Sequence, residues 1–220
     1  MNVTFQDVKN SPEIRTYITQ ADASLLALGF TEHSFAHVGK CAEVAARILT
    51  QLGYSDREIE LARIAAFMHD IGNVVNRSSH AISGATMAFR ILDKMGMEPA
   101  DVAAVITAIG HHDDATAFPV NAIAAALILA DKTDVRKSRV RNGDPSSFDI
   151  HDRVNYSVEQ SQVLLDTEEK TVTLSLIINT QVCAVMDYFE IFLHRMLLCR
   201  KAAEFFGLSF HLEINGLTLL

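Results

Sequence analysis

The feature that most constrains this chain is a succession of helical segments between residues 11 and 140, each with its own start and stop signals. Ser11 and Pro12 are a typical N-cap and first helical residue. Ser55 and Glu58 have the spacing of a capping box, and glycine follows several segments at the point where a helix can end. The pattern predicts helices over residues 11–28, 33–52, 55–70, 79–95, 98–110 and 121–135.

The pattern changes after a polar loop at residues 142–147. Two stretches rich in Val, Leu, Ile and Thr, 157–166 and 171–178, flank a short charged turn and predict a β-hairpin. The remaining predicted elements are a long apolar helix over 181–206 and a final strand over 209–219, with a turn at Asn215-Gly216.

We therefore expect a mainly α fold, with a domain of about six helices in residues 1–145 and a small α+β appendage in residues 146–220. The appendage contains the hairpin, the long helix and the final strand, and the hairpin needs a packed neighbour to be stable. Because the long helix is apolar on more than one side, we expect the appendage to pack on the first domain or to lie at a homodimer interface.

Composition narrows the class of protein. The chain has 220 residues, of which 49% are hydrophobic and 21% charged, as in globular proteins. A net charge of −8 disfavours extended nucleic acid and anionic membranes as partners. The scattered Cys41, Cys183 and Cys199 indicate reduced core residues, and the chain opens without a signal-peptide pattern, so we expect a cytoplasmic protein. The longest apolar run, residues 122–130, is too short to span a bilayer.

Histidine and aspartate recur at the ends of these apolar helices, where a titratable group is costly unless something binds it. Imidazole and carboxylate together suit Fe, Mn, Zn, Co or Ni. Seven such residues exceed the needs of one ion, and an aspartate can bridge two, so the set indicates a dinuclear centre of the kind that hydrolyses phosphate esters. The candidate ligands are His37, His69, Asp70, His80, His111, His112 and Asp131.

This order of residues on helices resembles the HD superfamily of metal-dependent phosphohydrolases, over about residues 33 to 140. The stretch from Ala65 to Gly72, which contains His69-Asp70, is very similar to the signature segment of that family. The resemblance implies an HD-type helical domain and two divalent ions, Fe or Mn first, followed by Ni, Co, Zn or Mg.

The same resemblance implies roles for the residues. His37, His69, Asp70 and Asp131 would hold one ion, and Asp70 would bridge to a second ion. A hydroxide between the ions would be the nucleophile, so Asp70 belongs to the catalytic machinery. The ligands that the resemblance gives to the second ion are His80, His111 and His112.

Two positions depart from the family pattern. The family often has lysine directly after the HDIG stretch, where it can contact the substrate phosphate, and Asn73 stands there in this chain. The loop at residues 113–119 lacks the Gly- and Tyr-containing pattern of the HD-GYP enzymes, which argues against cyclic di-GMP as substrate. Some of those enzymes place a Glu that binds a third metal four residues before the first histidine, where this chain has His33.

Basic residues crowd the stretch that follows Asp131. If the helix continues, Lys132, Arg136 and Arg139 share one face, and we expect Lys132 and Arg136 to contact substrate phosphate. The same residues also fit a solvated helix end, whose dipole favours cations.

The histidine pattern has a second interpretation, in which His69-Asp70 is a hydrogen-bonded helix end without metal and His112 orients His111 without binding an ion. The first hypothesis for function is a phosphohydrolase acting on a nucleotide or small phosphorylated metabolite. The second is a dinuclear iron oxygenase of the same fold, and the third is a non-catalytic, metal-stabilised sensing or interaction module.

Overall fold

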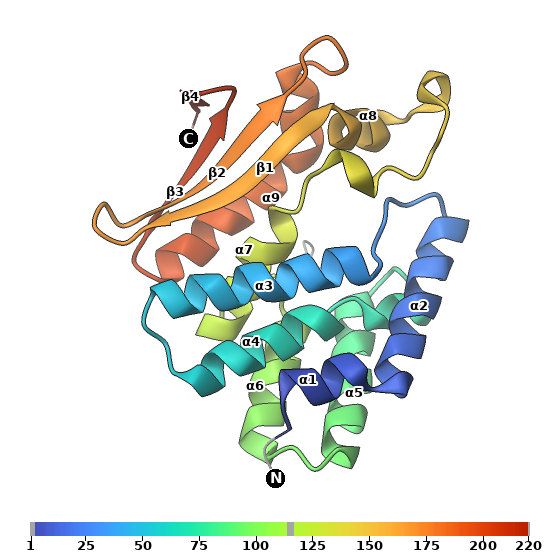
Figure 1. Cartoon of the computed structure of the whole chain (residues 1–220), viewed down its shortest axis with the longest axis vertical. Helices are drawn as coiled ribbons and strands as arrows, with labels where there is room; N and C mark the ends of the chain where they lie inside the picture. The colour runs from blue at the N-terminus through green and yellow to red at the C-terminus, as the bar shows by residue number, and fades with distance from the viewer. Residues whose placement is uncertain (1–2, 114–116, 220) are drawn as a thin grey trace.

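A computed structural model describes residues 3–113 and 117–219 of the chain. The fold is mainly helical, with a small sheet at one end of the molecule, as the sequence predicts (Figure 1). The helices that precede the sheet are α1 (Phe5–Asn10), α2 (Pro12–Ala27), α3 (Phe35–Gln51), α4 (Asp56–Met68), α5 (His80–Lys94), α6 (Pro99–Gly110), α7 (Ala122–Lys132) and α8 (Ile150–Ser157). Short 3₁₀ turns cover Ile71–Val74, Lys137–Arg139 and Pro145–Ser147.

Helices α2 and α4 begin at the capping residues that the sequence predicts. The Ser11 side chain accepts a hydrogen bond from the Ile14 amide, and Pro12 is the first residue of α2. Ser55 and Glu58 form both hydrogen bonds of a capping box at the start of α4. These contacts satisfy amides that the first helical turn leaves without a partner inside the helix.

Three features differ from the prediction. The sequence pattern does not predict helix α1, although Thr4 and Asp7 form a capping box at its start. It does not predict helix α8 either, which Asp149 caps. Helix α7 ends at Lys132 instead of continuing to about residue 135, and the Thr133 hydroxyl there donates to the Leu129 carbonyl oxygen at 2.5 Å.

The C-terminal region contains the predicted hairpin of β1 (Val158–Asp166) and β2 (Thr171–Ile178), which pair antiparallel. Helix α9 (Val185–Phe205) then crosses over, so that β3 (Ser209–Ile214) pairs parallel with β2. The predicted turn at Asn215-Gly216 ends β3, and a short β4 (Leu217–Thr218) then folds back on β3. Helix α9 contacts α7, which joins this region to the preceding helices.

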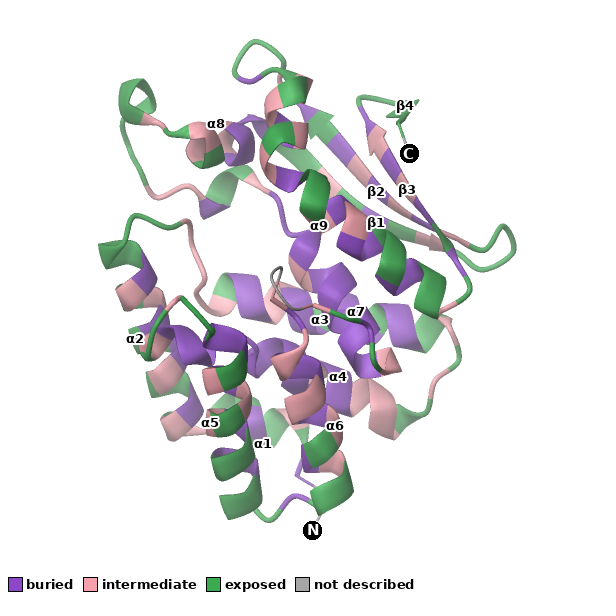
Figure 2. Cartoon of the chain, turned by 180° about the vertical axis from the view of Figure 1, so that it is seen from behind, coloured by how far each residue is buried: buried purple, intermediate pink, exposed green. Residues whose placement is uncertain are grey.

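The core follows the buried faces of α3, α4 and α7, and Figure 2 shows these central helices as the most buried part of the molecule. In α7 every residue from Ile123 to Ala130 is buried, which explains why its sequence is apolar on all sides. Cys41, Cys183 and Cys199 are buried, as expected for core residues. No helix in the described residues is long and apolar enough to cross a membrane.

Candidate metal centre

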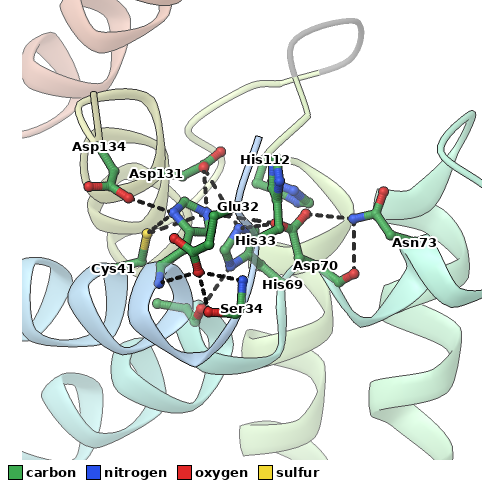
Figure 3. Close-up of polar contacts among 12 residues, drawn as sticks. Glu32, His33, Ser34, Cys41, His69, Asp70, Asn73, His112, Asp131 and Asp134 are labelled. Carbon is green, nitrogen blue, oxygen red and sulfur yellow. Dashed lines mark hydrogen bonds and ion pairs between the residues drawn. The ribbon is translucent and has the colours of Figure 1, made fainter. Parts of the chain in front are cut away.

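The candidate ligands meet in the interior because each lies at or near the end of a helix that points to the same place. Two lie near helix starts, in the first turn of α3 and at the first residue of α5, and the others lie at or just after the ends of α4, α6 and α7. Figure 3 shows part of this cluster, with Asp70 among side chains from several elements. The residues brought together are His37, His69, Asp70, His80, His112 and Asp131.

One half of the cluster forms around two carboxylates. The Nε2 atom of His37 lies 3.6 Å from Asp70 Oδ2 and 3.3 Å from Asp131 Oδ1. The Nε2 atom of His69 lies 3.2 Å from Asp70 Oδ2 and 3.7 Å from Asp131 Oδ1. These side chains therefore aim their ligand atoms at one small volume.

The other half forms around the second oxygen of Asp70. The Nε2 atom of His80 lies 3.4 Å from Asp70 Oδ1 and 3.2 Å from the Nε2 atom of His112. Asp70 thus presents Oδ2 to one set of histidines and Oδ1 to another, which is the arrangement that a bridging carboxylate requires. Its side chain is nearly fully buried, at 5% exposure for the whole residue.

The histidines of the cluster share one orientation. Each holds its Nδ1 atom against an acceptor outside the cluster, so Nδ1 carries the hydrogen and the Nε2 lone pair faces inward. Ligating histidines typically have this arrangement. The acceptors are Asp134 Oδ2 at 2.8 Å for His37, the Ala66 carbonyl at 2.7 Å for His69, the Arg77 carbonyl at 3.0 Å for His80 and the Ile109 carbonyl at 2.6 Å for His112.

This donor set fits a divalent metal. The Nε2 atoms of His80 and His112 lie 3.2 Å apart, with the Arg77 guanidinium 3.3 Å from His80 Nε2. The buried His69 Nε2 makes no hydrogen bond to any described residue. Buried lone pairs that converge on carboxylates are unfavourable unless a cation satisfies them. Neutral imidazole and ionised carboxylate are the forms that bind transition metals.

The electrostatic environment favours those ligand forms at several positions. Burial lowers the pKa of His80 and of His112, which keeps both rings neutral. Burial alone would raise the pKa of Asp70, but the neighbouring His69 holds it well below the usual value. Burial would likewise raise the pKa of Asp131, but the neighbouring Lys132 holds that pKa well below the usual value. His69 is the exception, because Asp70 and Asp131 outweigh burial, which would lower its pKa, and raise that pKa in the metal-free site.

Glycine allows the close packing that brings His80 to Asp70. A Cβ atom added to Gly72 would lie 2.0 Å from the His80 carbonyl oxygen and 2.5 Å from the Gly84 amide nitrogen. Gly84 in turn approaches the carbonyl of His69, at 3.2 Å from its own ideal Cβ position. The first turn of α5 therefore packs directly on the turn that follows His69-Asp70.

Asp134 is a functional candidate that the sequence pattern does not assign to the site. Its buried carboxylate accepts from His37 Nδ1 and pairs with Lys40 Nζ at 2.9 Å and Arg136 Nε at 3.0 Å. Although burial would raise its pKa, His37 and Arg139 hold that pKa far below the usual value. The signal in the sequence that could have found it is a carboxylate three residues after a ligand aspartate, in a stretch rich in basic residues.

The structure treats the two adjacent histidines differently. His112 is fully buried in the cluster, whereas His111 is half-buried and belongs to none of the possible ligand groups found among the described residues. Successive residues at a helix end point in different directions, so only one of the pair reaches the centre. His33 also lies outside these groups, with its Nδ1 atom 2.7 Å from the Thr31 carbonyl oxygen.

A cavity of about 310 Å³ opens onto the cluster, and Asp70, His80, His112 and Asp131 form part of its lining. Cations from several elements line it as well, in contrast to the acidic net charge of the chain. They are Arg77, Lys132, Arg139 and Arg195. Asp149 and Asp152 also line the cavity, but the cations outnumber these two carboxylates, so the walls beside the metal ligands can attract an anion.

The predicted basic helical face does not form, because α7 ends at Lys132. Lys132 is buried, lines the cavity and places Nζ 2.8 Å from Asp131 Oδ2. Arg136 is absent from the cavity lining and pairs instead with Glu32 at 3.0 Å and Asp134 at 3.0 Å. Within the loop whose sequence differs from that of the HD-GYP enzymes, residues 114–116 lie outside the described residues.

Comparison with known proteins agrees with this geometry. Residues 34–138 match the family model described as HD domain, a range that contains every residue of the cluster. The chain is also similar to the uncharacterized protein MJ1020 of Methanocaldococcus jannaschii, with 22% identity over 200 residues, which cover 80% of this chain and 76% of that protein. Residues 34–138 of this chain therefore match the HD domain, which is characteristic of a superfamily of metal-dependent hydrolases.

Proposed function

We propose that this protein is a metal-dependent phosphohydrolase that cleaves a phosphate ester or anhydride of a nucleotide or small phosphorylated metabolite. The observation that carries the proposal is the convergence of imidazole lone pairs and two carboxylates at the floor of a cation-lined cavity. Metal ligands below and cations around the same cavity suit an oxyanion whose charge must be neutralised.

Two divalent ions are proposed because Asp70 faces both halves of the cluster with different oxygens. His37, His69 and Asp131 would share one ion with Asp70. His80 and His112 would share the other. When bound, such ions supply Lewis acidity toward a phosphoryl group and lower the pKa of water. Iron or manganese is the first expectation for this mixed imidazole and carboxylate set.

Lys132 is proposed to contact the substrate. Its ammonium group lies beside Asp131 at the cavity wall and is almost fully shielded from solvent. A lysine held there can bind a phosphoryl oxygen as charge builds during cleavage. The sequence also predicts that Arg136 contacts substrate phosphate, but Arg136 forms ion pairs with Glu32 and Asp134. We therefore propose that it holds the Asp134 carboxylate in place, which in turn orients His37.

The test is a phosphate-release screen over nucleotides and small phosphate esters, with protein loaded with Mn²⁺ or Fe²⁺. Release that continues without oxygen and stops in chelator supports the proposal. Lys132→Ala should lower kcat/KM about ten- to hundred-fold at unchanged metal content. The matched control is Lys94→Ala, which removes an exposed lysine of α5 and should leave kcat/KM unchanged. Turnover that requires oxygen would move the dinuclear iron oxygenase to first place.

A further inference from the structure

The position where the family often carries a lysine holds Asn73, which has no charge to offer. Its side-chain nitrogen donates to the Asp70 carbonyl oxygen at 2.9 Å and to Asp70 Oδ1 at 2.9 Å. Its side-chain oxygen accepts from Arg77 Nη1 at 3.3 Å. Asn73 therefore links Asp70, the central carboxylate of the cluster, to Arg77 in the segment before α5.

Arg77 lies at the edge of the cluster and lines the cavity beside Asp70 and His80. Its guanidinium carbon lies 5.5 Å from the centre of the Phe30 ring, and Nη1 lies 3.3 Å from His80 Nε2. The aromatic ring and Asn73 hold the side chain from two sides. The fork is thus positioned at the cavity wall before any substrate arrives.

The charge of Arg77 is not neutralised by a carboxylate, since no ion pair joins it to an acidic side chain among the described residues. Two other cations of the cavity are paired, Lys132 with Asp131 at 2.8 Å and Arg139 with Asp134 at 3.7 Å. A guanidinium that is half-buried without an anion is disposed to bind one.

The contact between Arg77 and His80 also indicates that Arg77 is disposed to bind an anion. The His80 Nδ1 hydrogen goes to the Arg77 carbonyl oxygen at 3.0 Å, so Nε2 accepts from the arginine. With a metal ion on its Nε2 atom, His80 would no longer accept from Arg77. Arg77, which lines the cavity, would then have a donor available for an anion there.

We propose that Arg77 binds the phosphoryl group of the substrate and supplies the charge that Asn73 does not. The proposal rests on the proposed phosphohydrolase function. The planar fork of arginine can donate two parallel hydrogen bonds to a phosphate, which a lysine cannot do. Asn73 and Phe30 act as positioning residues for that fork.

The experiment measures binding of inorganic phosphate to the full-length, Mn²⁺-loaded protein by isothermal titration calorimetry, with metal content determined for each variant. Arg77→Ala should weaken binding about ten- to hundred-fold at unchanged metal content. Arg77→Lys should fall between Arg77→Ala and wild type. Arg90→Ala removes an exposed arginine of α5 that lies 3.7 Å from Glu13, and it should bind like wild type.

The outcomes separate the two proposals. Wild-type protein that binds no phosphate would contradict the proposed function itself. Arg77→Ala protein that binds phosphate as tightly as wild type would overturn only the role of Arg77. Loss of metal in Arg77→Ala would also overturn that role, because it would show that the side chain supports the cluster and not the anion.

Discussion

Replacing Gly72 by alanine tests how the metal centre is built. The added Cβ atom would lie 2.0 Å from the His80 carbonyl oxygen, whereas ordinary contact begins near 3.4 Å, so the two segments must separate by about 1.4 Å. Gly84 N and Ser83 Oγ lie 2.5 and 2.6 Å from the same position, so the alanine cannot move aside. Overpacking of this kind costs about 1–3 kcal/mol, and a backbone neighbour that cannot rotate away indicates the upper end.

The assay is thermal unfolding in chelator, followed by metal titration. In a domain of this size 1 kcal/mol corresponds to roughly 2–4 °C, so Gly72→Ala should lower Tm by roughly 6–12 °C. Because His80 moves away from Asp70, affinity for one of the two ions should fall as well. Gly39→Ala is the matched control, since it lies within α3 and its Cβ would meet nothing within 4 Å.

The melting temperature of the control variant should change in the opposite direction. Alanine is favoured over glycine inside a helix, so Gly39→Ala should gain roughly 0.4–1 kcal/mol and raise Tm by roughly 1–4 °C. If Gly72→Ala melts at the wild-type temperature and keeps its metal affinity, the close packing of α5 on the turn after His69-Asp70 does not determine the geometry of the metal centre.

Other predictions concern the cluster, its support and the surface. Asp70→Ala should abolish hydrolysis and the binding of both ions, and retention of both with full turnover would contradict the bridging role. Asp134 has a folded pKa far below its unfolded value, so the stability it contributes is present above about pH 4 and is lost as the pH falls toward that folded pKa. Asp134→Asn should therefore lower Tm at pH 7, by an amount that shrinks below about pH 4, and a shift independent of pH would argue against this. Met186 and Leu193 leave 73% and 46% of their surface exposed on α9, and we propose a homodimer through this helix. A monomer by light scattering at micromolar concentration would refute it.

Much of the helical framework was predictable because local signals agree with the tertiary packing. Ser11, Ser55 and Asn121 cap helices whose apolar faces form the core, so each start is determined by neighbouring residues. Helices α1 and α8 escaped prediction because six and eight residues are too few for an apolar period to stand out. The parallel pairing of β3 with β2 depends on the path of α9, which no local pattern records.

The candidate site was predictable to a similar extent. The order of histidines and aspartates along the chain indicated the centre, because each falls at or near the start or the end of an apolar helix. Which of the adjacent His111 and His112 turns inward depends on the exact end of α6, so spacing alone could not decide it. Arg77 was missed because its importance comes from contacts with Asn73 and Phe30, which only the folded chain brings together.

The most direct test of the account is anomalous diffraction from crystals of the protein loaded with Mn²⁺ or Fe²⁺. The account predicts two peaks per chain on either side of the Asp70 carboxylate, one next to His37 and His69 and the other next to His80 and His112. A single peak, no peak, or peaks that do not contact Asp70 would contradict the dinuclear centre.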